Sequence, residues 1–549
     1  MKRNKGITLI ALIITIIVML ILVAVSVNIL IKSNLIGTAE KTVNKYKTAT
    51  EDEASGGKIT INGKEYGSLD EFIKDEIPSD WDGTTTEVPE VKKNTETNAF
   101  DWYIYNEKQM KFFANYVNET LTEADNKFLA DLNLTKEDIA ITTDTVIYLM
   151  NDLNMGAKFD DNGNLSSGKQ WVPIGPSKDQ QLVGTFEGNN HYICGIYINR
   201  EEKSNGIFGN SNTVKNLTIK NSYIKGGNLT GGIAGAVRGG TIENCHNINT
   251  MVATQEGDTG SLGGIIGQSQ ANVIKNCTNS GKVIHNGNRQ RAQIGGIVGV
   301  SSETTEISNC TNYGDIYSSK DTGWYIGGIC GGFMMQSNKE GTISNCINNG
   351  RITGNASVGG IVGANWIGTT IKNCSNTAEI KGLSAVGGIV GQLGNTENGL
   401  QFSTVTECYN SGNLISMGTK ENSGALGGIV GGIKKTGRED VISKCYSKGK
   451  IENCEESVGA ILGYDDNTEK KVKLSSLYYL NTVGIGAIDG TDDEANKVQA
   501  VETDIKTYEE FIEWIKNKWT WHNITRRCII NKSPRWWNSY KTIGGVSNG

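Results

Sequence analysis

A glycine-rich phrase recurs along the middle of the chain and constrains its fold more than any other feature of the 549 residues. The seven closest copies are GGIAG (231–235), GGIIG (263–267), GGIVG (295–299), GGICG (327–331) and GGIVG again at 359–363, 387–391 and 427–431. Weaker copies flank the series, GIFG at 206–209 and GAILG at 459–463. Most copies begin 32 residues apart, with adjoining exceptions of 28 and 40. A fixed period of this length is typical of repeat architectures.

Each repeat contains three short β-type segments separated by Gly and Asn turns. The glycine phrase is followed by an apolar-Asn-Cys-x-Asn-x-Gly phrase, as in IKNCTNSGKV (274–283), and then by a short apolar segment. One such unit cannot bury its own apolar side, but stacked copies can, with each coil pairing to the next at about 4.8 Å. The repeat therefore predicts a mainly β fold, a parallel β-helix. Helical repeats of similar length need amphipathic runs of about 12 residues, and the Gly, Ile and Val content excludes them.

The seven cysteines of the second phrase occupy the same position in successive repeats, and we call this set the cysteine column. Leu217 and Leu477 take the same place in the first and last copies. The column consists of Cys245, Cys277, Cys310, Cys346, Cys374, Cys408 and Cys445. A position that accepts either Leu or Cys indicates a buried apolar group. Disulfides between rungs fit poorly because the Cβ vectors would run parallel, and the C-x₂₋₄-C pairs typical of zinc sites are absent from the sequence. We predict an internal stack of free thiols.

Asparagines flank these cysteines. Asn276, for example, precedes Cys277, and Asn279 follows it by two places. Asn tolerates left-handed backbone, and stacked amides form ladders along a coil axis. A structural role is therefore favoured over calcium binding, which would require more carboxylates.

The N-terminal segment differs from the rest of the chain. MKRNKG is followed by 25 uncharged residues (7–31), which as a helix would span a hydrocarbon core of about 30 Å. Lys2, Arg3 and Lys5 place the N-terminus in the cytoplasm by the positive-inside rule. The segment is longer than the apolar region of a cleaved secretory signal. We expect a membrane anchor that leaves the following body outside the cytoplasmic membrane.

The leader that ends in Gly6, followed by ITLIALIITIIV, resembles the N-terminal signature of type IV prepilins and pseudopilins. The resemblance implies cleavage between Gly6 and Ile7 by a prepilin peptidase, methylation of Ile7, and other pilins as partners. The membrane-anchor residues would include Ile7, Leu9, Leu12, Ile16 and Leu20. The family usually carries a glutamate five residues into the mature chain, where this sequence has Ala11, which puts packing into a filament shaft in doubt.

The repeats themselves resemble the GLUG repeat of bacterial surface proteins, on the strength of GGIVG followed by IxNCxNxG. WVPIG (171–175) and GTFEGNNHYICGIYI (184–198) resemble the coils that precede such repeats. The resemblance implies a right-handed β-helix. The segment 106–121, with Asn106 as N-cap and an apolar face that includes Met110 and Phe113, is suited to capping its open end.

These observations divide the chain into six expected parts. They are a leader (1–6), a hydrophobic pilin-like helix (7–50), a spacer and linker (51–98), an N-terminal cap with first coils (99–205), the GLUG-repeat β-helix (206–480) and a C-terminal tail or cap (481–549). Within the last part, residues 518–541 are rich in Trp and contain no acidic residue. They fit a cap, a basic aromatic surface patch or a frameshifted gene end.

No motif for catalysis, metal binding or a cofactor stands out. The four histidines form no H-E-x-x-H pair, and neither a P-loop nor a G-x-S-x-G elbow occurs in the sequence. A formal net charge of -6 without a basic run argues against nucleic acid as a partner. The aspartates are scattered over different repeats, at 160, 161, 258, 315 and 321. Four aromatics near the glycine phrases are candidate ligand contacts, Trp324, Tyr325, Phe333 and Trp366, with covering of coil corners as the alternative role.

The expected protein is therefore a non-enzymatic component of the bacterial cell surface, anchored by one membrane pass or attached to a pilus after leader cleavage. Its β-helical rod would serve adhesion to surface glycans or proteins, or act as a minor pilin at a filament tip. Two alternatives remain. A carbohydrate-active β-helix enzyme, a polysaccharide lyase or hydrolase, would need a carboxylate cluster on one face of the rungs. A passive surface spacer would bind no ligand.

Overall fold

The computed structural model of the chain describes most of residues 59–517. Gaps fall at 62–63, 67, 76, 256–259, 271, 289–290, 304, 320–322, 335–339, 367, 395–401, 419–423, 435–438, 455–456, 467–471, 481–497 and 503. The leader, the hydrophobic segment and residues 518–549 lie outside the described residues. No helix among the described residues is long and apolar enough to cross a membrane.

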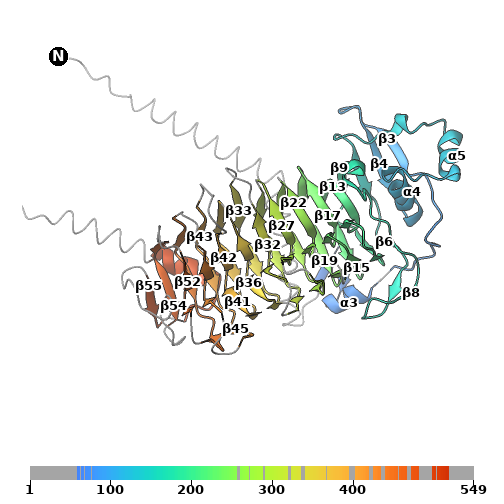
Figure 1. The fold of residues 1–549 in the computed structure, drawn as a ribbon. Coiled ribbons are helices and arrows are strands. Elements are labelled where there is room, and N and C mark those ends of the chain that lie inside the picture. The colour runs from blue at the N-terminus through green and yellow to red at the C-terminus, as the bar shows by residue number, and fades with distance from the viewer. Residues whose placement is uncertain are drawn as a thin grey trace, which may run out of the picture.

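The described chain forms a mainly β, parallel β-solenoid, which confirms this part of the predicted fold class (Figure 1). Each regular coil contributes five short strands, which pair with their counterparts in the coils before and after it. We number the five resulting sheets from the strand that follows the cysteine. Sheets 4 and 5 are joined through the long strand β13 at the N-terminal end. The right-handed sense of the coil stays a prediction.

Sheet 1 consists of β6 (Leu153–Asn154), β10 (Tyr192–Cys194), β14 (Thr218–Lys220), β19 (His246–Ile248), β24 (Thr278–Asn279), β29 (Thr311–Asn312), β34 (Ile347–Asn348), β39 (Ser375–Asn376), β44 (Tyr409–Asn410), β49 (Tyr446–Ser447), β54 (Leu477–Leu480) and β55 (Val498–Val501). Sheet 2 consists of β11 (Tyr197–Asn199), β15 (Tyr223–Gly226), β20 (Met251–Thr254), β25 (Val283–His285), β30 (Ile316–Ser318), β35 (Ile352–Thr353), β40 (Ile380–Gly382), β45 (Leu414–Ser416) and β50 (Ile451–Glu452).

Sheet 3 consists of β12 (Ser204–Asn205), β16 (Leu229–Gly231), β21 (Ser261–Gly263), β26 (Gln293–Gly295), β31 (Tyr325–Gly327), β36 (Ala356–Gly359), β41 (Ser384–Gly387), β46 (Leu426–Gly427) and β51 (Val458–Gly459). Sheet 4 consists of β13 (Phe208–Lys215), β17 (Ala234–Arg238), β22 (Ile266–Gln270), β27 (Val298–Ser302), β32 (Cys330–Met334), β37 (Val362–Asn365), β42 (Val390–Leu393), β47 (Val430–Ile433) and β52 (Leu462–Asp465).

Sheet 5 begins with β3 (Glu90–Lys93), β4 (Phe100–Ile104), β5 (Val146–Leu149) and β9 (Leu182–Glu187), which pairs with β13. It continues through β18 (Thr241–Glu243), β23 (Val273–Lys275), β28 (Glu306–Ser308), β33 (Gly341–Ser344), β38 (Thr369–Lys372), β43 (Thr404–Thr406), β48 (Val441–Ser443) and β53 (Lys473–Ser475). Strand β3 lies inside the expected linker and pairs antiparallel with β4. Two hairpins stand apart, β1 (Ile59–Ile61) with β2 (Lys64–Tyr66), and β7 (Lys158–Phe159) with β8 (Leu165–Ser167).

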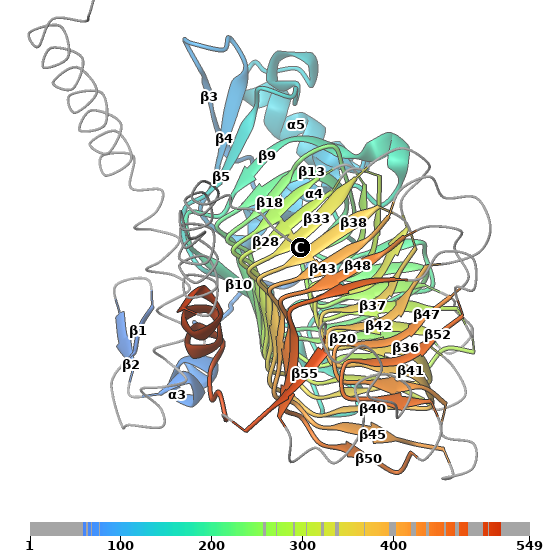
Figure 2. The ribbon, with the colours of Figure 1, turned by 90° about the vertical axis from the view of Figure 1, so that its left-hand side faces the viewer.

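The coil encloses two apolar cores rather than one. The larger lies between sheets 1, 4 and 5 and contains Cys277, Val298 and Ile307. The smaller lies between sheets 2 and 3 and contains Val283 and Ile294. Figure 2 shows the coils nearly end-on, with the strands of successive coils superimposed.

A narrow waist of asparagine and glycine separates the two cores. Five buried side chains form an amide ladder in which each Nδ2 donates to the Oδ1 of the next residue at 2.8–2.9 Å: Asn279, Asn312, Asn348, Asn376 and Asn410. The second glycine of the glycine phrase packs against this ladder. A Cβ at Gly296 would collide with the Asn312 side chain and with the carbonyl oxygen of Gly328. The glycine phrase and the asparagine of the cysteine phrase therefore recur together because they contact each other in the folded chain.

The asparagine that precedes most of the cysteines supplies a left-handed turn, as predicted; Glu407 and Lys444 take this place before Cys408 and Cys445. The φ angles are 56° at Asn276, 53° at Asn309, 54° at Asn345 and 53° at Asn373. Asn adopts this region at lower cost than most other non-glycine residues, which explains its recurrence at the entry to sheet 1.

Helix α4 (Glu107–Val117) covers the N-terminal end of the larger core. Asn106 is its N-cap, because the Asn106 side chain accepts a hydrogen bond from the Gln109 amide at 3.0 Å. Met110 and Phe113 are fully buried in the larger core, where the rings of Phe113 and Phe186 lie 6.4 Å apart. The predicted cap at 106–121 is therefore confirmed for the helical part. Helix α5 (Glu123–Asp131) and the 3-10 turns η1 (Glu137–Ile139) and η2 (Lys178–Gln180) complete this end.

Two further helices pack on the same outer face of sheet 1 (Figure 2), and they contact coils near opposite ends of the solenoid. Helix α3 (Leu69–Lys74) is held by Lys220, whose Nζ donates to the carbonyl oxygens of Phe72 and Asp75 at 2.7 and 2.6 Å. The helix at 508–517 packs Phe511 against the stacked rings of Tyr409 and Tyr446.

Candidate functional site

The cysteine column is part of the core and not a reactive site. All seven thiols are fully buried and unpaired, which confirms the predicted stack. Each Sγ points toward backbone carbonyls; that of Cys277, for example, lies 3.3 Å from Lys275 O. Burial raises the pKa of the Cys245 and Cys310 thiols, which opposes formation of the nucleophilic thiolate. Cys330 pairs with Val298 and Val362 in sheet 4, as the repeat alignment predicted, and burial raises its pKa to about 12.

Two histidines are also buried in the sheets. His246 Nδ1 lies 2.8 Å from Thr278 Oγ1, and His285 Nδ1 lies 3.1 Å from Ser318 Oγ. Burial lowers the pKa of both imidazoles to about 4, so both rings are neutral at pH 7. They are structural members of the sheets.

These histidines predict a loss of stability in mild acid. Their folded-state pKa of about 4 lies below the ordinary value of 6.5, so the unfolded chain binds more protons between these values. The stabilisation is complete above pH 6.5 and is lost as the pH falls towards 4, by about 2 kcal/mol per histidine at pH 5. We expect His246→Thr, which matches Thr218 and Thr278 in the neighbouring strands, to reduce the difference between urea midpoints at pH 7 and pH 5. An unchanged difference would contradict this assignment.

The outward side chains of sheets 3 and 4 contact one another, so the two sheets meet at a re-entrant angle. Ser357 Oγ on β36 donates to Gln392 Oε1 on β42 at 3.0 Å. At the corresponding place one coil earlier, the rings of Tyr325 and Trp366 pack edge to face, with centroids 5.3 Å apart and an interplanar angle of 88°. The angle between the sheets therefore brings together aromatic residues that are 41 positions apart in the chain.

Trp324 and Arg291 extend this cluster towards the preceding coil. The exposed guanidinium of Arg291 lies over the Trp324 ring, 5.5 Å from its centroid. Trp324 and Trp366 are half-buried, whereas Tyr325 is 8% exposed. Burial raises the pKa of Tyr325, which keeps its hydroxyl protonated. We call Arg291, Trp324, Tyr325 and Trp366 the aromatic corner.

The aromatic corner contains three of the four predicted ligand contacts and excludes the fourth. Phe333 is fully buried in the larger core, so the expectation that it faces a ligand is corrected. Ligand binding by the other three stays a prediction. Arg291 was not identified from the sequence, although the 32-residue repeat places position 292 beside Trp324 in the next coil. The predicted processing and anchor residues, from Gly6 to Leu20, lie outside the described residues.

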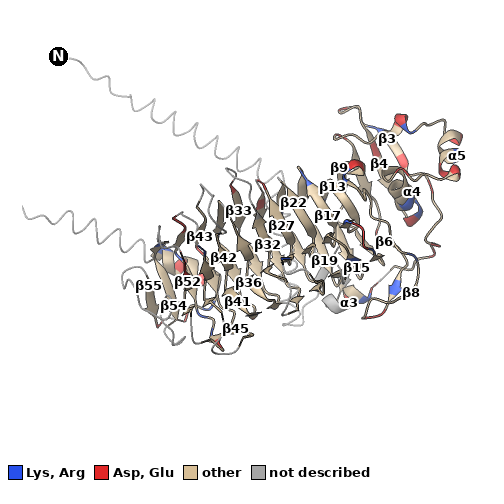
Figure 3. Cartoon of the chain, in the orientation of Figure 1, with Lys and Arg blue, Asp and Glu red and all other residues tan. Residues whose placement is uncertain are grey.

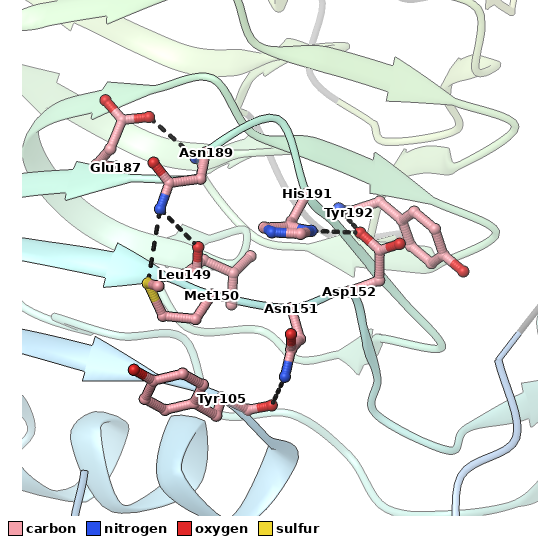
Figure 4. A network of polar contacts seen from close by, with 9 residues as sticks. All are labelled: Tyr105, Leu149, Met150, Asn151, Asp152, Glu187, Asn189, His191 and Tyr192. Atoms are coloured by element: carbon pink, nitrogen blue, oxygen red, sulfur yellow. Dashed lines mark hydrogen bonds and ion pairs between the residues drawn. The ribbon is translucent and has the colours of Figure 1, made fainter. Parts of the chain in front are cut away.

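A histidine–carboxylate pair joins two N-terminal coils (Figure 4). His191 Nδ1 lies 3.0 Å from Asp152 Oδ1, which also accepts the Tyr192 amide at 2.9 Å. Such a pair orients the base of a catalytic triad. Across the described part of the chain, however, no serine, threonine or cysteine side chain forms a hydrogen bond with His191. The nearby Asn189 ties the same coils together by donating to Leu149 O at 2.9 Å. The arrangement is that of a structural link.

The aspartates that an enzyme would need do not converge. Asp160 closes the β7–β8 hairpin by accepting the amides of Asn162 and Asn164, and Asp315 pairs with Arg351 at 2.7 Å on sheet 2. Asp258 and Asp321 lie outside the described residues. Among described side chains, no group of three or more His, Cys, Asp or Glu is arranged to hold a metal ion. Figure 3 shows most of the visible solenoid strands free of charged residues, with charges gathered at α4, α5 and β8.

Two segments match the GLUG motif. They are residues 258–284 and 354–381, each spanning parts of two successive coils. A segment of 95 residues is 33% identical to halomucin of Haloquadratum walsbyi, and it covers 17% of this chain and 1% of halomucin. A crystal structure of a candidate immunoglobulin A1 protease from Bacteroides ovatus is similar over 69% of this chain and 86% of that chain, at 16% identity and a TM-score of 0.34. That structural likeness is too low to support an argument about function.

Proposed function

We propose that this chain is a non-enzymatic cell-surface protein whose β-solenoid presents the aromatic corner to a glycan. The observation that carries the proposal is that two partly exposed indole rings each contact a residue with a polar group. Trp366 packs against the Tyr325 ring, and Trp324 lies under the Arg291 guanidinium. Aromatic faces offer apolar surface to sugar rings, and the polar groups at their edges supply hydrogen bonds.

The solenoid supports a binding role because it holds the corner rigidly. Tyr325 belongs to β31, and Trp366 directly follows β37. Both strands are paired on both sides, so these residues lose little conformational entropy when a ligand binds. A binding protein also fits the separation of Asp160 and Asp315, since a glycoside hydrolase needs two neighbouring carboxyl groups.

Several features support a location outside the cytoplasm. GLUG repeats and the similarity to a segment of halomucin favour a surface or extracellular protein. The uncharged segment 7–31 provides a membrane anchor in the proposal, and cleavage between Gly6 and Ile7 would pass the chain to the pilin export route. Because Ala11 replaces the usual glutamate, we propose a tip position or a non-filament role over a place in the shaft.

The binding proposal is tested by applying the purified full-length protein to an array of immobilised bacterial and host glycans. We expect retention on a subset of glycans and a loss of about tenfold or more in affinity for the Trp324→Ala, Trp366→Ala double variant, because each stacked ring contributes of the order of 1 kcal/mol. Phe402→Ala removes a 59% exposed ring elsewhere and is the matched control, expected to bind normally. Equal binding by both variants would refute the assignment of the corner.

A further inference from the structure

A second candidate site lies near the N-terminal cap, well separated in sequence from the aromatic corner. It is a pocket between α4, the segment before β3 and the segment after β8. Its lining residues are Trp81, Gly83, Lys111, Met155, Lys169, Gln170, Trp171 and Gly195. The space among these residues is about 250 Å³, which includes space open to solvent.

The polar side chains that line this pocket can donate hydrogen bonds, and no acidic side chain lies among the lining residues. Lys111 and Lys169 take part in no ion pair within the described part of the chain, and no carboxylate lines the pocket. Gln170 uses its Oε1 to accept the Asn199 amide at 3.2 Å, which leaves its amide NH₂ as a third donor. Two cations and an amide donor around one small space favour an anion.

Lys111 gives the strongest indication of an anion site, because its side chain is half-buried. Its Nζ lies 6.0 Å from the centroid of the Trp171 ring, and burial lowers the pKa of this ammonium group. The nearest acidic influence on it is Asp125, whose carboxylate is already engaged by Thr86, Asn115 and Thr122. A partly desolvated ammonium without a counter-ion is stabilised when an anionic ligand supplies one.

The two tryptophans that line the pocket indicate which class of anion it binds. Trp81 is half-buried, with its Nε1 donating to Thr85 O at 2.8 Å, and Trp171 is buried, with its Nε1 donating to Ile207 O at 3.2 Å. Both indole N–H groups are thus used within the protein, and the rings contribute apolar surface. An inorganic anion gains nothing from such surface, whereas a sugar ring does.

We infer that this pocket, defined by Lys111, Lys169, Gln170 and the two tryptophans, binds the carboxylate of an acidic sugar of the uronate class. In this inference the carboxylate of the sugar faces the ammonium groups of Lys111 and Lys169, and the sugar ring contacts the apolar surface of the tryptophans. The inference is independent of the aromatic corner, because the two sites share no residue.

The test is titration calorimetry of the full-length protein with D-glucuronate, D-glucose and inorganic phosphate, at pH 7 and low salt. We expect glucuronate to bind at least about tenfold more tightly than glucose or phosphate, because only glucuronate offers both the charge and the ring. Lys111→Gln is expected to weaken glucuronate binding about tenfold or more. Lys169→Gln provides a second variant, at an exposed position, that is not expected to disturb folding.

Two control variants show whether glucuronate binding is confined to this pocket. Lys178→Gln removes an exposed lysine on η2 and is expected to leave binding unchanged, as is Phe402→Ala, which removes an exposed ring outside both sites. The inference is overturned by absence of glucuronate binding, by equal affinity for phosphate and glucuronate, or by normal binding in both the Lys111 and the Lys169 variant. Loss of glucuronate binding in the Lys178 variant would show that binding is not confined to this pocket and would likewise overturn the inference.

Discussion

Gly328→Ala is expected to lower the free energy of unfolding by about 3 kcal/mol or more, a large effect for one methyl group. The added Cβ would collide with the Asn348 side chain and with the carbonyl oxygen of Gly360 in the next coil. Neither can move freely, because Asn348 lies within the amide ladder and Gly360 lies in the same waist. The affected coils would have to separate, and the loss would be visible as a lower urea midpoint.

Gly239→Ala is the matched control. Gly239 has a φ of 65°, and a Cβ there has nothing within 4 Å. Only backbone strain applies, so the expected cost is about 1 kcal/mol. If the Gly239 variant lost as much stability as the Gly328 variant, the waist would not be the reason for the recurring glycine phrase.

Asn312→Ala is expected to cost about 2–4 kcal/mol because it interrupts the amide ladder between Asn279 and Asn348. The Asn312 side chain accepts from Asn279 Nδ2 at 2.9 Å, and donates to Asn348 Oδ1 and Gly314 O, each at 2.9 Å. Its removal leaves buried polar atoms of both neighbours with fewer partners. Since each coil of a solenoid contacts mainly its neighbours, hydrogen exchange should accelerate most in the coils around β29.

Asn349→Ala tests whether burial in the ladder is what matters. Asn349 follows Asn348 directly but is exposed, and its side chain accepts only from Thr377 Oγ1 in the described part of the chain. The expected change is within about 0.5 kcal/mol. Comparable losses for the two variants would show that the ladder contributes nothing special.

The sequence predicted those features of the molecule that repeat in every coil. The glycine phrase and the cysteine recur together from coil to coil, and their substitutions, Leu217 for Cys and Cys330 for Val, reveal burial directly. The α4 cap was predictable because its apolar residues follow helical spacing and Asn106 precedes them. In each case a local pattern carries the information.

The division into two cores was not predictable in this way. The contact between Gly296 and Asn312 joins residues of different coils, and only the path of the coil brings them together. Phe333 was misplaced for a related reason. In the neighbouring coils the paired positions hold Ser301 and Asn365, which are polar but buried. The residue types at this position of the repeat therefore do not show that its side chain faces the core.

The candidate sites were only partly predictable. Three aromatic residues stood out by type, but their partner Arg291 and the angle between sheets 3 and 4 emerge only from the fold. The His191–Asp152 link and the Lys111 pocket lie among the first coils, where the chain does not follow the repeat. No period exists there from which their neighbours could be inferred.

We expect the solenoid to bind a glycan without cleaving it. The most direct test is mass spectrometry of the glycan recovered after prolonged incubation with the full-length protein, using glycans retained on the array. We expect the glycan to be recovered intact and its retention to depend on Trp324 and Trp366. Shortened or unsaturated products that disappear in a His191→Ala variant would contradict this expectation, and would identify the His191–Asp152 pair as part of an active site.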